Sequence, residues 1–315
     1  MPTYRQILFK ALNIALTHRS LWFFGFFTAL FGAGGEIELL LQSSSLGENQ
    51  GVIVSFFAGF FEGGFFNAAT LSGLFNLMLS QPFSFLIFLF LLTLVLAAMV
   101  LVVWLLIVSQ VALVNGALLV LKNQSVSWSE SFKVGMANFW PIFFINTLLK
   151  VISWGLLAVL AALTVLNFSG LTPLFVFGFM LFVWLILFLS FITKYAILFI
   201  VTKKQQAGQA VKGALNLFSK NWLLSLEVAV TLFVIYWLVN SAFLVLFREV
   251  MAYVLFQRPG AIGGYIFFSF VIFAFLQMLL AVFHWISWVI VFQILNNKQL
   301  AFNSRLVDGF KKIFG

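Results

Sequence analysis

The chain contains three long stretches without a single acidic or basic side chain. They cover residues 63–121, 151–193 and 259–297, and none contains Asp, Glu, Lys or Arg. Charged residues make up only 8% of the chain, against about 25% in ordinary soluble domains. So few charges cannot cover a large soluble core, whereas about 20 apolar residues suffice for one spanning helix. The stretches therefore predict an all-α, polytopic membrane helix bundle.

Six transmembrane helices in three hairpins account for these stretches within a single integral membrane domain, 1–315. The segment NFSGLTP divides the second stretch, because Asn, Ser, Gly and Pro favour a turn. The segment 42–82 is expected to be an outer insertion lying on or dipping into the membrane, since its apolar run before Glu62 is too short to cross. The expected spans lie near 21–41, 83–121, 140–166, 173–201, 222–247 and 264–295.

A basic amphipathic helix precedes several of these spans. Over residues 207–220 an apolar stripe alternates with a polar face that carries Lys212 and Lys220. Such a helix suits the headgroup layer of a membrane. The same order, ending in an interfacial Trp, occurs at 4–22 and 127–140, and the basic tail 296–315 resembles a fourth copy. The motifs FKALN, VKGALN and FKVGMAN indicate either a common modular origin or the basic ends usual in membrane proteins.

The distribution of Lys and Arg predicts the orientation, because positive loops stay in the cytoplasm. With six spans, 14 of the 17 basic residues share one side, which places both termini and the tail 296–315 in the cytoplasm of a multi-pass cell-membrane protein. The first apolar run is expected to remain as an uncleaved anchor. The net charge of +9 follows these loops. The expected partners are therefore membrane lipids, through anionic headgroups, and not nucleic acid; a protein partner is not identified.

Two segments resemble a known group of proteins. RSLWFFGFFTALFGAGGE and IVTKKQQAGQAVKGALNLFSKNW are similar to segments of bacterial six-span membrane proteins. That group includes the membrane domain joined to some glycerophosphoryl diester phosphodiesterases. The resemblance implies a six-span fold in a bacterial inner membrane. The phosphodiesterase activity of those fused proteins belongs to a separate soluble barrel, so the resemblance implies no such activity here.

Three ionisable residues fall within the expected spans: Lys150, Glu227 and His284. Charged groups at this depth are costly, so they usually face the bundle interior and find partners. The long stem of Lys150 brings it within plausible reach of Glu227. One interpretation is a polar pathway, extended along the helices by Asn146, Thr231 and Gln277. The other, which we favour, is a structural ion pair with His284 bonded to a neighbouring group.

Other chemistry has little support in the sequence. The chain has no cysteine and only two histidines, so we expect no metal site, no cofactor and no catalytic residue. The glycines of residues 32–35 precede an acid, Glu36, which favours a bend or close packing over a phosphate loop. We expect a non-enzymatic membrane component that organises lipid or a partner protein. The alternatives are a small-solute or ion transporter or channel and, with least support, an intramembrane lipid enzyme.

Overall fold

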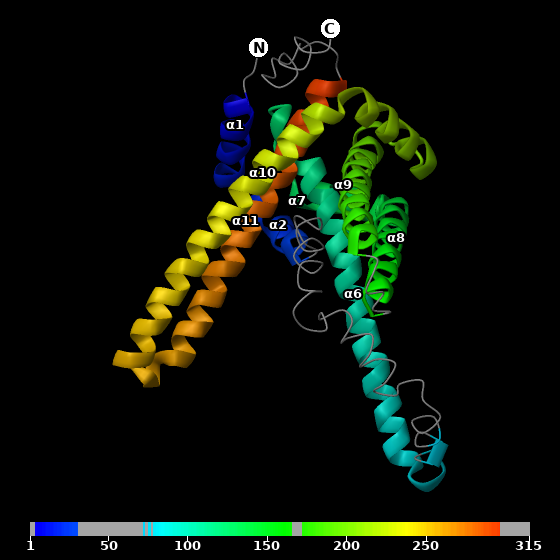
Figure 1. Cartoon of the computed structure of the whole chain (residues 1–315), viewed down its shortest axis with the longest axis vertical. Helices are drawn as coiled ribbons and strands as arrows, with labels where there is room; N and C mark the ends of the chain where they lie inside the picture. The colour runs from blue at the N-terminus through cyan, green and yellow to red at the C-terminus, as the bar shows by residue number, and fades with distance from the viewer. Residues whose placement is uncertain (1–3, 31–71, 73–74, 77, 166–171, 297–315) are drawn as a thin grey trace. The chain divides into compact units, whose positions relative to one another are not determined.

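The computed structural model describes residues 4–30, 72, 75–76, 78–165 and 172–296 (Figure 1). Within these residues the chain is helical and forms no strand. The fold class is therefore all-α, as predicted. The described elements are α1 (Tyr4–Thr17), α2 (Ser20–Leu30), α6 (Pro82–Leu121), α7 (Trp128–Ala137), α8 (Phe139–Val165), α9 (Thr172–Lys203), α10 (Ala207–Gln257), the short 3-10 helix η2 (Pro259–Ala261) and α11 (Ile262–Asn296).

Four of the described helices are long and apolar enough to cross a membrane. They lie at Pro82–Leu121, Phe177–Lys203, Ala207–Gln257 and Ile262–Asn296. A fifth crossing is available where α7 and Phe139–Ile152 of α8 meet at a bend of 60°. These helices fall on five of the six expected spans. The sixth, near 21–41, is described only as far as Leu30 by the 11-residue helix α2.

Two other predicted segments lie largely outside the described residues. They are the outer insertion 42–82 and the basic tail 296–315. The chain divides into two compact units, one formed by 1–35, 106–149 and 188–315, the other by 36–105 and 150–187. The prediction of a single domain is not tested by this division.

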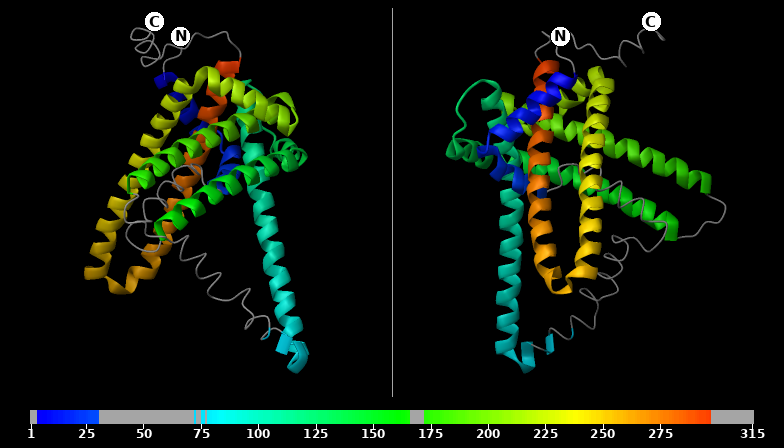
Figure 2. Two further views of the ribbon diagram at one scale, coloured as in Figure 1. Left: turned by 45° about the vertical axis from the view of Figure 1, so that its right-hand side comes forward. Right: turned by 90° about the vertical axis from the view of Figure 1, so that its left-hand side faces the viewer.

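Helix α11 is the packing centre of the first unit. It contacts α1, α2 and α10, and the views of Figure 2 show α10 and α11 running side by side. Gly25 of α2 allows a close approach to α11, because a Cβ atom there would collide with Val282. The N-terminal helices therefore depend on the last described helix of the chain for their packing.

The core of the first unit lies in the C-terminal halves of three long helices. Buried apolar side chains run along α6 from Leu106 to Val120, along α9 from Phe191 to Val201, and along α11 from Met278 to Ile294. Trp288 is its largest fully buried side chain. Close packing is again built on glycine, since a Cβ on Gly135 of α7 would lie 2.6 Å from the carbonyl oxygen of Val108 in α6.

The second unit holds the N-terminal part of α6, residues 150–165 of α8 and the N-terminal part of α9. Its described large apolar side chains are mostly exposed. Examples on α6 are Phe83, Phe90 and Val100, and Met180 and Trp184 follow on α9. Surfaces of this kind suit contact with lipid acyl chains and would be costly in water.

Helix α10 joins the basic amphipathic segment and the expected span in one run of 51 residues. The two parts meet at Asn221, where φ is −134° and ψ is 29°, outside helical values, and Figure 1 shows the helix turning there. In the first part Ala210 and Ala214 are fully buried. The Phe218 ring stacks on Phe191 of α9, with centroids 5.2 Å apart. Most of the apolar stripe of this segment is therefore covered by protein, while Leu215 remains exposed.

Candidate functional site

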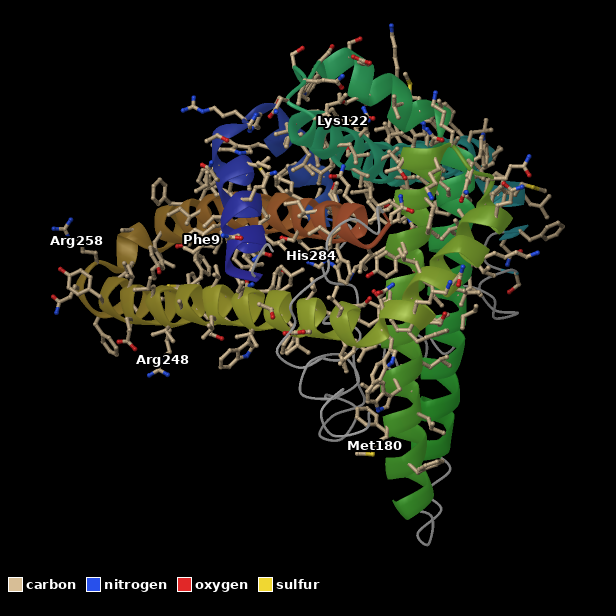
Figure 3. All side chains as sticks on the ribbon, turned by 90° about the horizontal axis from the view of Figure 1, so that it is seen from above. Phe9, Lys122, Met180, Arg248, Arg258 and His284 are labelled. Carbon is tan, nitrogen blue, oxygen red and sulfur yellow. The ribbon has the colours of Figure 1, made fainter. Side chains whose placement is uncertain are left out.

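The three predicted site residues lie on three different helices. Lys150 is exposed on α8, whereas Glu227 on α10 and His284 on α11 are half-buried, and Figure 3 shows the position of His284. Each of them makes at least one polar, ionic or ring interaction. Glu227 and His284 belong to the first unit and Lys150 to the second, so the predicted contact between Lys150 and Glu227 stays a prediction.

The polar residues that were expected to extend a pathway bond within the protein. The Asn146 amide donates to Gln110 Oε1 of α6 at 2.9 Å, and both residues are buried. The Thr231 hydroxyl donates to the Glu227 carbonyl oxygen at 2.8 Å. The first bond joins α8 to α6, and the second satisfies the Thr231 hydroxyl within its own helix. Both bonds favour a structural role for Asn146 and Thr231.

Gln277 is the centre of a polar group in the α10–α11 hairpin. Its Nε2 donates to Asn240 Oδ1, and its Oε1 accepts the Tyr236 hydroxyl, both at 2.5 Å. Interhelical bonds of this kind average about 0.6 kcal/mol in membrane proteins. Gln277 therefore joins α11 to α10 by hydrogen bonds.

Sequence analysis missed the most deeply placed charge in the described residues, Lys194. Its side chain is only 8% exposed. Its Nζ lies 5.0 Å from the centre of the fully buried Trp288 ring of α11. A cation over an aromatic face is stabilised by about 2 kcal/mol when water is excluded. The signal was present in the sequence, because Lys194 lies about 13 Å before the end of α9 at 1.5 Å per residue.

Trp288 links Lys194 to the rest of a buried polar cluster, defined here as Lys194, Tyr195, Ser225, His284 and Trp288. Its ring meets that of Tyr195 edge-on at 5.7 Å and lies 6.3 Å from that of His284. Its indole nitrogen is buried and has no hydrogen-bond partner in the part of the chain that is described. An unsatisfied buried donor costs about 1–3 kcal/mol, so the Trp288 indole is a polar group that the packing of the cluster does not satisfy.

A chain of hydrogen bonds connects this cluster to the break in α10. Ser225 Oγ donates to the Asn221 carbonyl oxygen at 2.9 Å. Its single proton is thereby used, so in the 2.7 Å contact with Tyr195 the tyrosine hydroxyl must be the donor. Asn221 Nδ2 in turn donates to the Leu217 carbonyl oxygen at 3.0 Å. The break is thus held by specific bonds on both sides.

The same local design occurs at the end of each basic amphipathic helix. Asn138, with φ −106° and ψ 14°, ends α7 and donates from Nδ2 to Val134 O at 2.9 Å. Thr17 ends α1 and donates to Asn13 O at 2.7 Å. In all three places a side chain donates to the carbonyl oxygen four residues earlier, and in α7 that oxygen also accepts the backbone N–H of Asn138. We call α1–α2, α7–α8 and α10 the three helix–break–helix motifs.

Each motif has exposed lysines on its amphipathic helix and a tryptophan shortly after its break. Lys10, Lys133, Lys212 and Lys220 are exposed on the amphipathic helices. Trp140 and Trp222 follow two of the breaks and are exposed. At the first break the Arg19 guanidinium lies 5.9 Å from the centre of the Trp22 ring, whose indole nitrogen donates to Ala15 O. Trp beside Lys or Arg is typical of a membrane–water interface.

Within the described residues, no group of three His, Cys, Asp or Glu side chains is placed to hold a metal ion. Comparison with protein-family models, with curated protein sequences and with solved structures finds no match to this chain. The resemblance to the membrane domain of glycerophosphoryl diester phosphodiesterases therefore stays an expectation.

Proposed function

We propose that the protein is a non-enzymatic, six-span component of a bacterial inner membrane that organises anionic lipid, or a partner protein, at its cytoplasmic face. The observation that carries this proposal is the threefold occurrence of the helix–break–helix motif with exposed lysines on the amphipathic helix before each break. An organising role needs a fixed array of charges, and the hydrogen-bonded breaks supply one.

Charge distribution supports the orientation. With both termini in the cytoplasm, the three amphipathic helices lie on the cytoplasmic side, and α2 begins the first of the six spans. Arg248 and Arg258 then lie on the opposite side; Figure 3 shows both toward one end of the α10–α11 hairpin. Arg248 is in addition 3.5 Å from Glu249, so less positive charge is available at that end.

The contribution of the exposed lysines to the affinity for anionic lipid can be measured. A Lys or Arg near an anionic surface contributes about 1 kcal/mol, which is about fivefold in affinity. Full-length protein purified in detergent is titrated with phosphatidylglycerol, and bound lipid is counted by native mass spectrometry. The double variant Lys212→Gln/Lys220→Gln should bind with about 25-fold lower affinity.

The matched control is Arg248→Gln/Arg258→Gln, which removes two charges from the other end of the same helix. It should leave phosphatidylglycerol binding close to that of the unmodified protein. Equal losses in the two double variants would contradict the proposal, because binding would then follow net charge and not the motif.

The second candidate function is transport of a small solute or ion. The buried Lys194 favours it, because ionisable residues inside a membrane commonly mark a transport pathway. Glu227 and His284 belong to the same unit, and Lys150 remains part of this hypothesis as a prediction. A pathway predicts that Lys150→Leu and Lys194→Met abolish flux in proteoliposomes while insertion stays normal. A structural role predicts lower folded yield instead.

A further inference from the structure

Helix α1 has two apolar faces, whereas its sequence suggested one. The first face packs on α11 and consists of Ile7, Ala11, Ile14 and Ala15, each at most 6% exposed. The second lies on the opposite side of the helix at 100° per residue. It consists of Phe9, Leu12 and Leu16, which are 59%, 44% and 51% exposed. Figure 3 shows Phe9 on α1. Between the two faces runs a polar strip of Gln6, Lys10, Asn13 and Thr17.

The amphipathic part of α10 has no such second face. Its apolar stripe is already covered, with Ala210 and Ala214 buried and Phe218 packed on α9. Its exposed large apolar side chain, Leu215, lies between Lys212 and Ser219, both one turn away and exposed. The remaining surface is polar.

Helix α7 is similar to α10 in this respect. Its Gly135 approaches the α6 backbone, and its exposed Trp128 is in ring contact with Phe23 and Phe24 of α2. Met136 is then the exposed large apolar residue that remains on α7. Of the three amphipathic helices, only α1 presents a stripe of large apolar side chains that the described protein leaves exposed.

Charge identifies the occupant of this stripe. The first 35 residues contain no acidic residue, and Lys10 and Arg19 are exposed beside the stripe. An apolar face flanked by basic residues matches a leaflet of anionic lipids, which offers acyl chains below and negative charge above. A helix of this kind inserts its apolar face about 5–10 Å into the headgroup and acyl boundary.

We infer that α1 lies in an anionic leaflet with Phe9, Leu12 and Leu16 inserted, and that the amphipathic parts of α7 and α10 stay above it. This inference deepens the proposed function and rests on it, because it assigns lipid contact to one of the three motifs. The contact with α11 makes α1 an inserted helix that is fixed to the bundle.

Site-directed spin labelling tests this directly, since the chain has no cysteine to remove. Labels are placed through Leu12→Cys and Asn13→Cys on α1, and through Leu215→Cys and Asn216→Cys at the matching Leu-Asn pair of α10. The full-length protein is reconstituted in vesicles of phosphatidylcholine alone or of phosphatidylcholine with phosphatidylglycerol. Collision rates with oxygen and with a water-soluble nickel chelate give the depth of each label.

The label at position 12 should lie about 5–10 Å below the headgroups, and deeper with phosphatidylglycerol than without it. The labels at 13, 215 and 216 should collide mainly with the water-soluble chelate. A label at position 12 that is open to water would overturn the inference. One that is shielded from both reagents would also do so, by indicating a protein occupant.

Equal depth of label 12 in both kinds of vesicle would overturn the assignment to anionic lipid. These results are separable from the proposed function. If Lys212→Gln/Lys220→Gln lowers phosphatidylglycerol binding while label 12 stays in water, the proposed function stands and the inference about α1 fails. If label 12 inserts but the lysine variant binds phosphatidylglycerol normally, the proposed role of Lys212 and Lys220 in lipid binding is contradicted.

Discussion

The two halves of α11 have similar apolar character and opposite surroundings. In the N-terminal half Phe267, Phe268 and Phe270 are 70%, 64% and 68% exposed, whereas in the C-terminal half Trp288 and Phe292 are 0% and 1% exposed. The N-terminal half packs along α10, through Tyr265 and Phe273, and leaves its other side exposed, whereas the C-terminal half is enclosed by protein. Hydropathy alone cannot separate these halves, because lipid and protein interior accept the same side chains.

Small and polar residues do not separate the two halves either. The N-terminal half contains Ser269, Ala274 and Gln277, and the C-terminal half contains Ala281, His284 and Ser287, whose hydroxyl donates to Phe283 O within the helix. Small residues allow helices to approach closely when lipid supplies no hydrophobic drive for association. The difference teaches that packing, and not hydropathy, defines where this protein has a core.

The largest change in stability is expected when one phenylalanine is replaced in each half of α11. Phe292→Ala should lower the free energy of unfolding by about 3 kcal/mol, because it leaves a cavity in a closely packed core. Phe268→Ala, the matched control, should change it far less, because lipid fills the space. Unfolding in mixed micelles with increasing SDS measures both, and equal losses would remove the distinction between the halves.

A smaller loss is expected where glycine permits close packing. Gly135→Ala should destabilise the protein by about 1–3 kcal/mol, because the new methyl group meets the Val108 carbonyl, which cannot move aside. Gly155→Ala on α8 meets nothing within 4 Å. It should be neutral or stabilising, since Ala is the better helix former. Thermal unfolding in detergent compares them; a stable Gly135→Ala variant would argue against this packing.

The smallest difference in stability is expected in the buried polar cluster, and it depends on the direction of the hydrogen bond between Tyr195 and Ser225. Ser225→Ala leaves the buried Tyr195 hydroxyl without its acceptor and should cost about 1–3 kcal/mol. Tyr195→Phe leaves Ser225 still bonded to Asn221 O, so its cost should be about 1 kcal/mol. The same unfolding assay ranks the two variants. A larger loss of stability for Tyr195→Phe than for Ser225→Ala would indicate that Ser225 donates to Tyr195 and not the reverse.

Much of the helix pattern could be predicted from the sequence. Five of the six predicted spans coincide with helices α6, α8, α9, α10 and α11, because uncharged runs of this length have few other stable forms. The change from amphipathic helix to span near Trp140 and Trp222 was also predicted, since Trp marks a membrane interface, but the breaks at Asn138 and Asn221 were not. The positions of long helices depend mainly on local sequence.

Tertiary contacts could not be predicted in the same way. Lys194 was counted among the basic residues of the cytoplasmic side, because sequence does not reveal that the ring of Trp288, 94 positions later, lies against it. The partners of Asn146 and Gln277 and the second apolar face of α1 depend likewise on which helices meet. A helical pattern identifies an apolar stripe but not whether protein or lipid lies against it.

The packing of α1 and α2 on α11 has a consequence for biosynthesis. These helices leave the ribosome before their partner α11, which is completed more than 260 residues later. At about 5–20 residues per second, the wait lasts roughly 13–50 seconds. During this time the face of α2 around Gly25 lacks its packing partner α11. Nascent chains that stall before α11 should therefore be preferred targets of membrane quality-control proteases.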